Sequence, residues 1–379
     1  TQEEADAVSK VLLSNKVNYW TGTECREFEK EFAAFAGTQY AVALSNGTLA
    51  LDVALKAMGI GAGDDVIVTS RTFLASASCI VTAGANPVFA DVDLNSQNIS
   101  AETIKAALTP NTKAIIVVHL AGMPAEMDGI MDLAKEHDLW VIEDCAQAHG
   151  AKYKGKSVGS IGHVGAWSFC QDKIMTTGGE GGMVTTNDKE LWSKMWSYKD
   201  HGKSYDAVYH REHAPGFRWL HESFGTNWRM MEMQAVIGRI QLKRMPEWTA
   251  RRQAHAAKLA ESLGKFKSIR LIEVADYIEH AQYKFYAFVK PEHLKEGWTR
   301  DRIVNELNAR KVPCYQGSCS EVYLEKAFDN TPWRPKERLK NAVQLGDTSL
   351  MFLVHPTLTD DEIAFCKEHI EAVLAEATA

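Results

Sequence analysis

Short apolar segments alternate with amphipathic ones between residues 40 and 190. Most of the apolar segments lack a regular polar/apolar alternation, as expected for strands buried on both faces of a sheet. Segments such as 48–59 and 125–138 have helical periodicity and separate several of them. Strand and helix in alternation predict a mostly parallel sheet covered by helices, with ligands beyond the carboxyl ends of its strands. The expected strands are residues 40–44, 65–70, 86–93, 113–120, 138–145, 164–169 and 181–186.

The pattern changes in the last third of the chain. Residues 231–263 predict long helices with a break at Pro246, and residues 283–290 predict a strand. The last helix begins with the spacing of a capping box over 359–362, followed by apolar residues at helical intervals. A chain of this length usually exceeds one core, so we expect two domains. They are a large α/β domain, residues 1–250, and a smaller α+β domain, residues 251–379.

Composition narrows the classes of function. The chain has 379 residues, of which 45% are hydrophobic and 24% charged, and its formal net charge is −7. A net negative charge argues against nucleic acid as a partner, because proteins that bind polyanions usually present a basic face. No apolar run approaches the roughly 18 residues of a membrane span. The first residues, TQEEADAVSK, lack the pattern of a secretory signal. Seven cysteines without a CxxC pair favour a reducing cytoplasm and no metal site.

The segment Ser45-Asn46-Gly47-Thr48 follows an expected strand and begins a helix. Free backbone N–H groups at a helix start, beside a hydroxyl, form an anion site whose usual occupant is phosphate. The alternative is a simple N-cap in which Asn46 or Thr48 satisfies these donors.

Two carboxylates, Glu143 and Asp144, end an apolar strand. A carboxylate beside a heteroaromatic nitrogen keeps that nitrogen protonated, because an opposite charge favours the charged form. Gln147 follows three residues after Asp144, and its amide could reach the same ligand. The alternative is that one of the acids is a solvated loop residue.

Lys173 lies between two apolar segments and just ahead of four glycines, within SFCQDKIMTTGGEGG. Partial desolvation makes a lysine amine more nucleophilic, as Schiff-base chemistry requires. The glycines permit a close approach of backbone to a bulky group, or they form only a tight turn. The segment is neither a GxGxxG fingerprint nor a Walker loop, whose lysine follows its glycines.

These features occur in the order helix start, carboxylate, lysine. A phosphate, a pyridine nitrogen and an aldehyde would match them in turn, and pyridoxal phosphate carries all three. The pattern therefore favours this cofactor.

At these residues the chain resembles the DegT/DnrJ/EryC1/StrS family of sugar aminotransferases that use pyridoxal phosphate. The resemblance spans most of the chain and rests on several segments in one order. It implies the aspartate-aminotransferase fold, with a mostly parallel seven-stranded sheet and a smaller C-terminal domain. The most specific segments are SNGTLAL, TFLASA, HLAGMPAEMD, IEDCAQAHGA, SFCQDKIMTTGGEGG and GTNWRMMEMQAVIGRIQL.

The resemblance implies roles for individual residues. Lys173 matches the Schiff-base lysine and general acid/base, and Asp144 matches the partner of the pyridine nitrogen. Gln147 matches the residue near the ring hydroxyl, and Phe73 the aromatic that stacks on the ring.

The same resemblance implies a phosphate site and a partner. Gly47 and Thr48 match the phosphate-binding turn, joined by Ser168. Asn227 resembles the asparagine that reaches the phosphate from a neighbouring subunit, which implies a homodimer with shared active sites.

The reaction implied by the family has two halves. Glutamate donates its amino group to give pyridoxamine phosphate and 2-oxoglutarate. The amine then passes to a keto group of a nucleotide-linked sugar, with Lys173 moving the proton. Family habit favours C4 of a 4-keto-6-deoxy sugar, and the product would serve a surface polysaccharide such as O-antigen, another glycan or a secondary metabolite.

Departures from the family pattern fall where the sugar should be recognised. Arg71 stands where small residues are common and would place a cation near the mouth of the site. Tyr315 belongs to a segment, 314–323, that often carries a histidine in relatives. Tyr19 and Trp20 are further candidates for the wall of the sugar pocket, or else pack on the core.

Two alternative functions stay open at this point. Some relatives are sugar dehydratases that carry histidine in place of the lysine, and Lys173 argues against this. The other is a non-catalytic member that binds the cofactor or a nucleotide sugar, for which a Schiff-base lysine would have no use.

Overall fold

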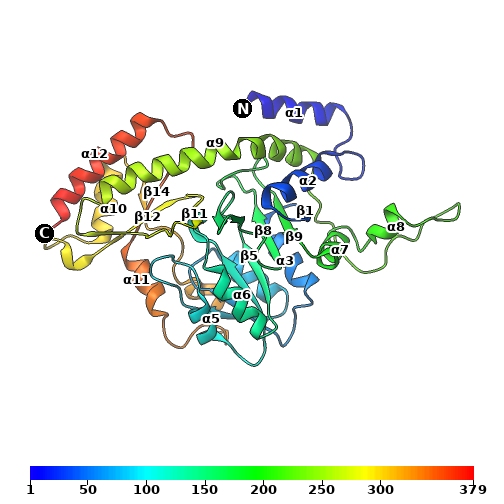
Figure 1. Cartoon of the computed structure of the whole chain (residues 1–379), viewed down its shortest axis with the longest axis horizontal. Helices are drawn as coiled ribbons and strands as arrows, with labels where there is room; N and C mark the ends of the chain where they lie inside the picture. Colours follow the sequence, from blue (N-terminus) through cyan, green and yellow to red (C-terminus); the bar gives the residue numbers. More distant parts are fainter.

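The computed structural model describes residues 1–379. A seven-stranded sheet forms the centre of the molecule (Figure 1). Its strand order is β1-β9-β8-β5-β4-β2-β3, and only β9 runs antiparallel to its neighbours. The predicted fold class is therefore confirmed, and each predicted strand lies within two residues of an observed one except at the end of β3. The strands are β1 (Tyr40–Leu44), β2 (Asp65–Thr69), β3 (Asn86–Ala90), β4 (Thr112–Val118), β5 (Trp140–Asp144), β8 (Val164–Ser168) and β9 (Gly182–Thr186).

Helices cover both faces of this sheet, which explains why its strands are apolar on both sides. Successive residues of β4 separate into two cores: Ile116 packs with one set of helices and Ile115 and Val117 with another. The first face is covered by α3 (Gly47–Ala57), α4 (Ala75–Thr82) and α7 (Lys189–Tyr198). The second is covered by α2 (Glu24–Ala36), α5 (Ala101–Ala107), α6 (Met127–Glu136) and part of α9 (Glu232–Leu263).

The long helix α9 runs across the body of the molecule, from beside α2 to beside α12 (Figure 1). It contacts α1 (Gln2–Leu13) and α2 near its start and α12 (Asp360–Ala377) near its end. The helix continues through Pro246, so the break expected there is absent. Proline in a helix interior costs about 3 kcal/mol, and packing along the whole of α9 outweighs this cost. The proposed boundary at residue 250 falls within this continuous helix.

A second, antiparallel sheet follows α9, in the order β10-β12-β14-β13. The final helix α12 begins with the expected capping box between Thr359 and Glu362. Elements of this part are β10 (Ile269–Leu271), β12 (Phe285–Val289), α10 (Arg300–Ala309), β13 (Cys314–Tyr315), α11 (Lys340–Thr348) and β14 (Ser349–Phe352). A small third sheet joins β11 (Ile278–Glu279), β6 (Lys152–Tyr153) and β7 (Lys156–Ser157).

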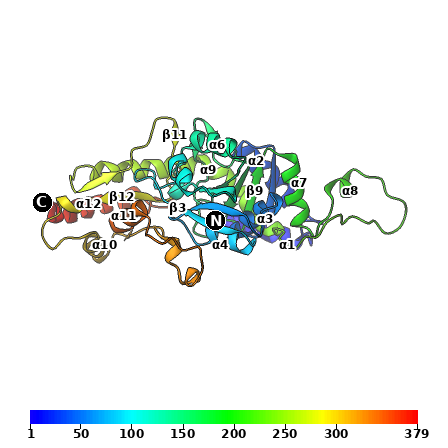
Figure 2. The same cartoon turned by 90° about the horizontal axis from the view of Figure 1, so that it is seen from below.

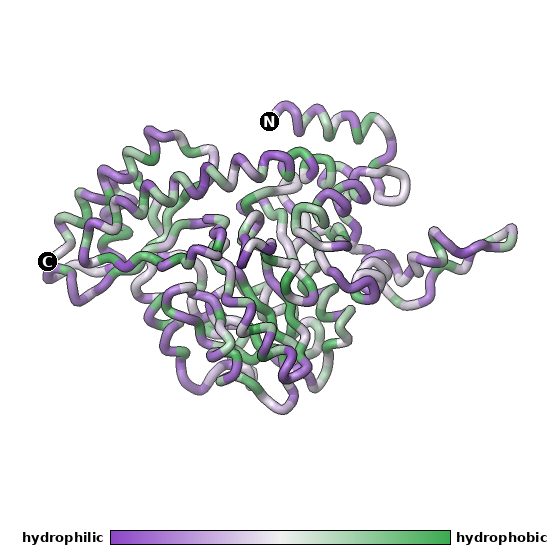
Figure 3. Tube along the Cα trace, viewed as in Figure 1, coloured by the Kyte–Doolittle hydropathy of each residue, from purple (hydrophilic) through white to green (hydrophobic).

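An arm, residues 201–226, projects from the body beside α7 and carries the short helix α8 (Tyr205–Tyr209) (Figures 1 and 2). Three of its large apolar side chains face solvent: Phe217, Trp219 and Phe224 are 76%, 82% and 99% exposed. In Figure 3 the central sheet is largely hydrophobic in colour and the arm is mostly hydrophilic. Phe217 and Trp219 pack on each other, with ring centres 4.9 Å apart, so the arm carries an exposed pair of aromatic rings.

None of the helices combines the length and the apolar character that crossing a membrane requires.

Candidate active site

The site lies at the carboxyl ends of β1, β5 and β8, as the parallel sheet predicts. Its cradle for an anion is the start of α3, where Asn46 Oδ1 accepts a 3.0 Å hydrogen bond from the Leu49 N–H. Asn46 is therefore the N-cap, as the alternative interpretation proposed, but it satisfies only one of the first-turn donors. The N–H groups of Gly47 and Thr48 have no helical partner and stay available to a ligand.

Gly47 lies directly against Ser168, at the end of β8. A Cβ on Gly47 would come within 2.5 Å of Ser168 Cβ and 2.9 Å of its Oγ. A side chain longer than hydrogen does not fit here, so glycine is required by this close approach. Gly47 of the phosphate-binding turn and Ser168, which the resemblance adds to it, are thus in contact.

Asp144 ends β5 and is 7% exposed. Its Oδ2 accepts a 2.8 Å hydrogen bond from Ser76 Oγ on α4, and its Oδ1 accepts one of 3.1 Å from the Ala146 N–H. Burial raises the pKa of Asp144, while Ser76, the Ala146 N–H and the nearby charge of Lys173 oppose this rise. The carboxylate has no ion-pair partner within the chain, so it is prepared to receive a cationic group.

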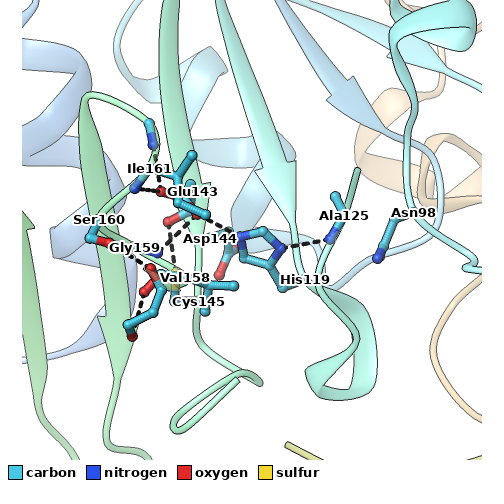
Figure 4. Close-up of polar contacts among 12 residues, drawn as sticks. Asn98, His119, Ala125, Glu143, Asp144, Cys145, Val158, Gly159, Ser160 and Ile161 are labelled. Atoms are coloured by element: carbon cyan, nitrogen blue, oxygen red, sulfur yellow. Dashed lines mark hydrogen bonds and ion pairs between the residues drawn. The ribbon is translucent and has the colours of Figure 1, made fainter. Parts of the chain in front are cut away.

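Glu143 points to the other side of the strand and has a different environment (Figure 4). Its carboxylate accepts hydrogen bonds from the N–H groups of Gly159, Ile161 and Gly162 at 2.7–2.9 Å. His119 Nε2 donates a fourth bond of 2.9 Å to it. Burial alone would raise the pKa of Glu143. The hydrogen bonds from His119 and the backbone N–H groups lower it by more than burial raises it, so the net shift of the pKa is downward.

His119 is held in one tautomer by this arrangement. Its Nδ1 accepts a 3.1 Å bond from the Ala125 N–H, so its Nε2 carries the proton that faces Glu143 (Figure 4). Cys145 could add a third metal ligand nearby, but its thiol donates to the Glu143 carbonyl. The ligand atoms of His119, Glu143 and Cys145 are therefore already engaged in hydrogen bonds within the chain. Neither acid is the solvated loop residue considered as an alternative.

Lys173 lies in the turn between β8 and β9, with its side chain 18% exposed. Its Nζ is 3.6 Å from Asp172 Oδ1 and 5.6 Å from the centre of the Tyr283 ring. Tyr283 comes from the segment before β12, more than a hundred residues away in sequence. The lysine is thus bordered on one side by the part of the chain that follows α9.

Gln147 and Phe73 are the two residues expected to contact the cofactor ring. Gln147 Oε1 accepts a 2.7 Å bond from the Ala121 N–H, which fixes the amide. Phe73 precedes α4 and is 70% exposed. An exposed aromatic ring at the end of a parallel sheet is unpartnered within this chain and free to stack on a planar ligand.

Asn227 is exposed at the base of the arm. Its neighbour Trp228 accepts a 3.0 Å bond from the Ser45 N–H, which ties this segment to the turn before α3. No hydrogen bond of the Asn227 side chain is present within the chain.

The residues predicted for the sugar do not form one cluster. Tyr19 is 2% exposed; its hydroxyl donates to Glu29 and accepts from the Trp196 indole. Trp20 stacks on Tyr209 of α8. Tyr315, by contrast, is 47% exposed on β13. Tyr19 thus packs in the core, as its alternative interpretation proposed.

Arg71 is fully buried and does not lie at the mouth of the site. Its guanidinium donates to Gln97 Oε1 and Ser349 Oγ, at 3.1 and 3.2 Å, and lies 5.6 Å from the Tyr286 ring centre. Its expected position near the mouth is therefore wrong, because neutral acceptors in the loop after β3 and at the start of β14 draw the side chain inward. Burial lowers the pKa of Arg71.

Two site residues were not predicted. Ser76 lies in the TFLASA segment, and a helical offset of three from Phe73 could have suggested it. Tyr283 could not have been found, because only the tertiary fold brings it to Lys173.

Comparisons with known proteins agree with this geometry. The family model described as the DegT/DnrJ/EryC1/StrS aminotransferase family matches residues 1–371. A solved aminotransferase structure from Psychrobacter cryohalolentis shares 65% identity, with a TM-score of 0.97 over 99% of this chain and 97% of that one. GDP-perosamine synthase of Escherichia coli O157:H7 is 42% identical over 374 residues, which is 98% of this chain and 95% of that protein.

A third relative carries a different substrate name. UDP-N-acetyl-3-dehydro-α-D-glucosamine 3-aminotransferase of Acidithiobacillus ferrooxidans is 42% identical over 363 residues, 94% of this chain and 90% of that protein. The family match covers nearly the whole chain, and the two named relatives match 98% and 94% of it. The chain is therefore an enzyme of the DegT/DnrJ/EryC1/StrS aminotransferase family.

Proposed function

We propose that this aminotransferase uses pyridoxal phosphate to move an amino group from glutamate to a keto group of a nucleotide-linked sugar. The observation that carries the proposal is the convergence of three groups at one end of the sheet. They are the helix start at Gly47, the buried carboxylate of Asp144 and the amine of Lys173.

The residues present fit this cofactor. The N–H groups at the start of α3 and the hydroxyl of Ser168 suit a phosphate, and the glycine at 47 leaves room for it. Asp144 is buried without a cationic partner, which is unfavourable unless a ligand supplies one. A protonated pyridine nitrogen is such a group.

When bound, the cofactor supplies an electron sink for the carbon that exchanges its amine and proton. Lys173 Nζ would bind the aldehyde carbon and, once released, move the proton at the substrate carbon. Asp144 would hold the ring nitrogen in its protonated form. Gln147 would orient the ring hydroxyl, and Phe73 would cover the ring and exclude water.

The substrate class follows from the relatives. The names of the two relatives include a GDP-linked and a UDP-linked sugar, so a nucleotide-linked sugar is their common feature. The similarity to GDP-perosamine synthase and the expectation from the sequence together favour a 4-keto-6-deoxy sugar. We propose amination at C4 and a role in making amino sugars for polysaccharides.

The assembly we propose is a homodimer with shared active sites. Its support is the arm, whose exposed aromatic residues Phe217, Trp219 and Phe224 need a partner surface. Asn227 at the base of the arm would reach the cofactor phosphate of the second copy. The seven free thiols are consistent with work in the cytoplasm.

The test is product analysis with defined substrates. Purified enzyme, pyridoxal phosphate and glutamate are incubated in turn with a GDP-linked 4-keto-6-deoxy sugar and a UDP-linked 3-keto sugar. The proposal expects mass spectrometry to show an amine in place of the carbonyl of the first sugar, with 2-oxoglutarate formed in equal amount. Release of 2-oxoglutarate without amination of either sugar would contradict the substrate class.

A further inference from the structure

Tyr283, Asp172 and Lys173 form a connected polar group next to the amine that the proposed function uses. Tyr283 Oη donates a 2.7 Å hydrogen bond to Asp172 Oδ2. The other oxygen of the same carboxylate, Oδ1, is 3.6 Å from Lys173 Nζ. One carboxylate thus connects the phenol and the amine.

Tyr283 is well placed to orient this carboxylate because its own position is fixed. Its side chain is 7% exposed, and its N–H donates a 2.9 Å bond to the Ala121 carbonyl. Arg252 donates to the Tyr283 carbonyl at 3.4 Å. Ala121 also donates to Gln147, so the phenol is anchored to the turn that holds a predicted cofactor residue.

Asp172 is negatively charged at neutral pH. Partial burial alone would raise the pKa of its carboxyl group. The hydrogen bond from Tyr283 and the charge of Lys173 together lower it by more than this, so the net shift of the pKa is downward. The hydrogen bond and the ion pair both favour the ionised form, which leaves a fixed negative charge beside the lysine nitrogen.

Resting on the proposed function, we propose that Asp172, oriented by Tyr283, is a positioning residue for Lys173. Its carboxylate holds the free amine near the reacting carbon, and it stabilises the proton on the lysine nitrogen when that nitrogen is joined to the cofactor. The hydroxyl of Tyr283 acts only through Asp172. Both effects are electrostatic, so they persist at a separation of 3.6 Å without direct contact with the substrate.

The test follows the pH at which the visible band of the bound cofactor changes, since this midpoint reports the proton on the Lys173 nitrogen. Asp172→Asn should lower the midpoint by roughly 0.5 to 1 pH unit, because it removes a negative charge close to a cation. Tyr283→Phe should lower it by less. The double variant should match Asp172→Asn alone, because Tyr283 works through the same carboxylate.

Asp128→Asn is the matched control. Asp128 pairs with Lys154, whose Nζ lies over two tyrosine rings. Its side chain is 59% exposed, against 61% for Asp172. It lies on α6 and does not pair with Lys173. Its midpoint should equal that of the wild type. An unchanged midpoint in Asp172→Asn, or additive shifts in the double variant, would overturn the inference and leave the proposed function standing. No cofactor band in the wild type would overturn both.

Discussion

Ser76 Oγ on α4 donates a 2.8 Å hydrogen bond to the buried carboxylate of Asp144 at the end of β5. The hydroxyl of Ser76 also lies 2.9 Å from that of Thr72, so it belongs to a short chain of hydroxyl groups. The helix α4 thereby sets the direction in which Asp144 faces the site.

Ser76→Ala should weaken cofactor binding. A hydrogen bond to a charged group contributes about 1.5 to 3 kcal/mol, so we expect the Kd of pyridoxal phosphate to rise roughly 10-fold to 100-fold. Fluorescence titration of apoenzyme measures it, with Ser78→Ala on the same helix as control. Equal Kd values for the two variants would show that the Ser76 bond does not support Asp144.

Gly47→Ala should destabilise the protein and impair phosphate binding. The new methyl group would lie 2.5 Å from Ser168 Cβ and 3.0 Å from its Cα, so the turn or the strand has to move. We expect unfolding in urea to become easier by roughly 1 to 3 kcal/mol. Gly61→Ala, whose methyl group would meet nothing closer than 3.8 Å, should have a much smaller effect. Similar losses in both variants would contradict the packing argument.

Arg71→Lys tests whether this buried cation connects the two sheets or contacts substrate. Lysine keeps the charge but cannot reach both Gln97 and Ser349, so we expect a loss of about 1 to 3 kcal/mol in the free energy of unfolding. The exposed Arg302→Lys should change stability little. A raised KM for the sugar with unchanged stability would instead assign Arg71 to the substrate.

His149 should make stability depend on pH. Its ring is packed against Trp167, Phe32 and Phe169, and neither nitrogen has a hydrogen-bond partner. Burial, together with the charges of Lys173 and Arg252, lowers the pKa of His149 from 6.5 to about 3. The folded-state pKa lies below the unfolded one, so the contribution is complete above pH 6.5 and is lost as pH falls toward 3.

Replacing His149 by Phe should therefore flatten the acid side of the stability curve. Each such histidine lowers the free energy of unfolding by about 1.4 kcal/mol per pH unit in this window. Urea unfolding at several pH values compares His149→Phe with wild type and with the exposed His137→Gln, which should keep the wild-type slope. An unchanged slope in His149→Phe would show that the buried ring is not the source.

Much of the fold follows from local patterns in the sequence. The strands β4 and β5 could be predicted because most of their residues are apolar and buried, without a regular polar/apolar alternation. Gly47, Asp144 and Lys173 each follow a strand, and a parallel sheet brings the carboxyl ends of its strands to one edge, so the sequence predicts that they lie near one another.

Other features depend on contacts between distant segments. The burial of Arg71 requires Ser349 of the second sheet, and the role of Asp172 requires Tyr283. The different surroundings of Glu143 and Asp144 follow from their opposite directions on one strand. The sequence predicts this alternation, but which of the two faces the site depends on the loop over 159–162 and on Ser76.

The most direct test of the account is whether the transfer of an amino group from glutamate to the cofactor requires Lys173. Absorbance spectra are recorded for the wild type, Lys173→Ala and the exposed control Lys156→Ala, each loaded with pyridoxal phosphate, before and after glutamate is added. The account predicts that the visible band is present and converts to the pyridoxamine spectrum in the wild type and in Lys156→Ala. In Lys173→Ala neither the band nor the conversion should appear. A wild-type protein that shows no such band, or a Lys173→Ala variant that converts like the wild type, would contradict the account.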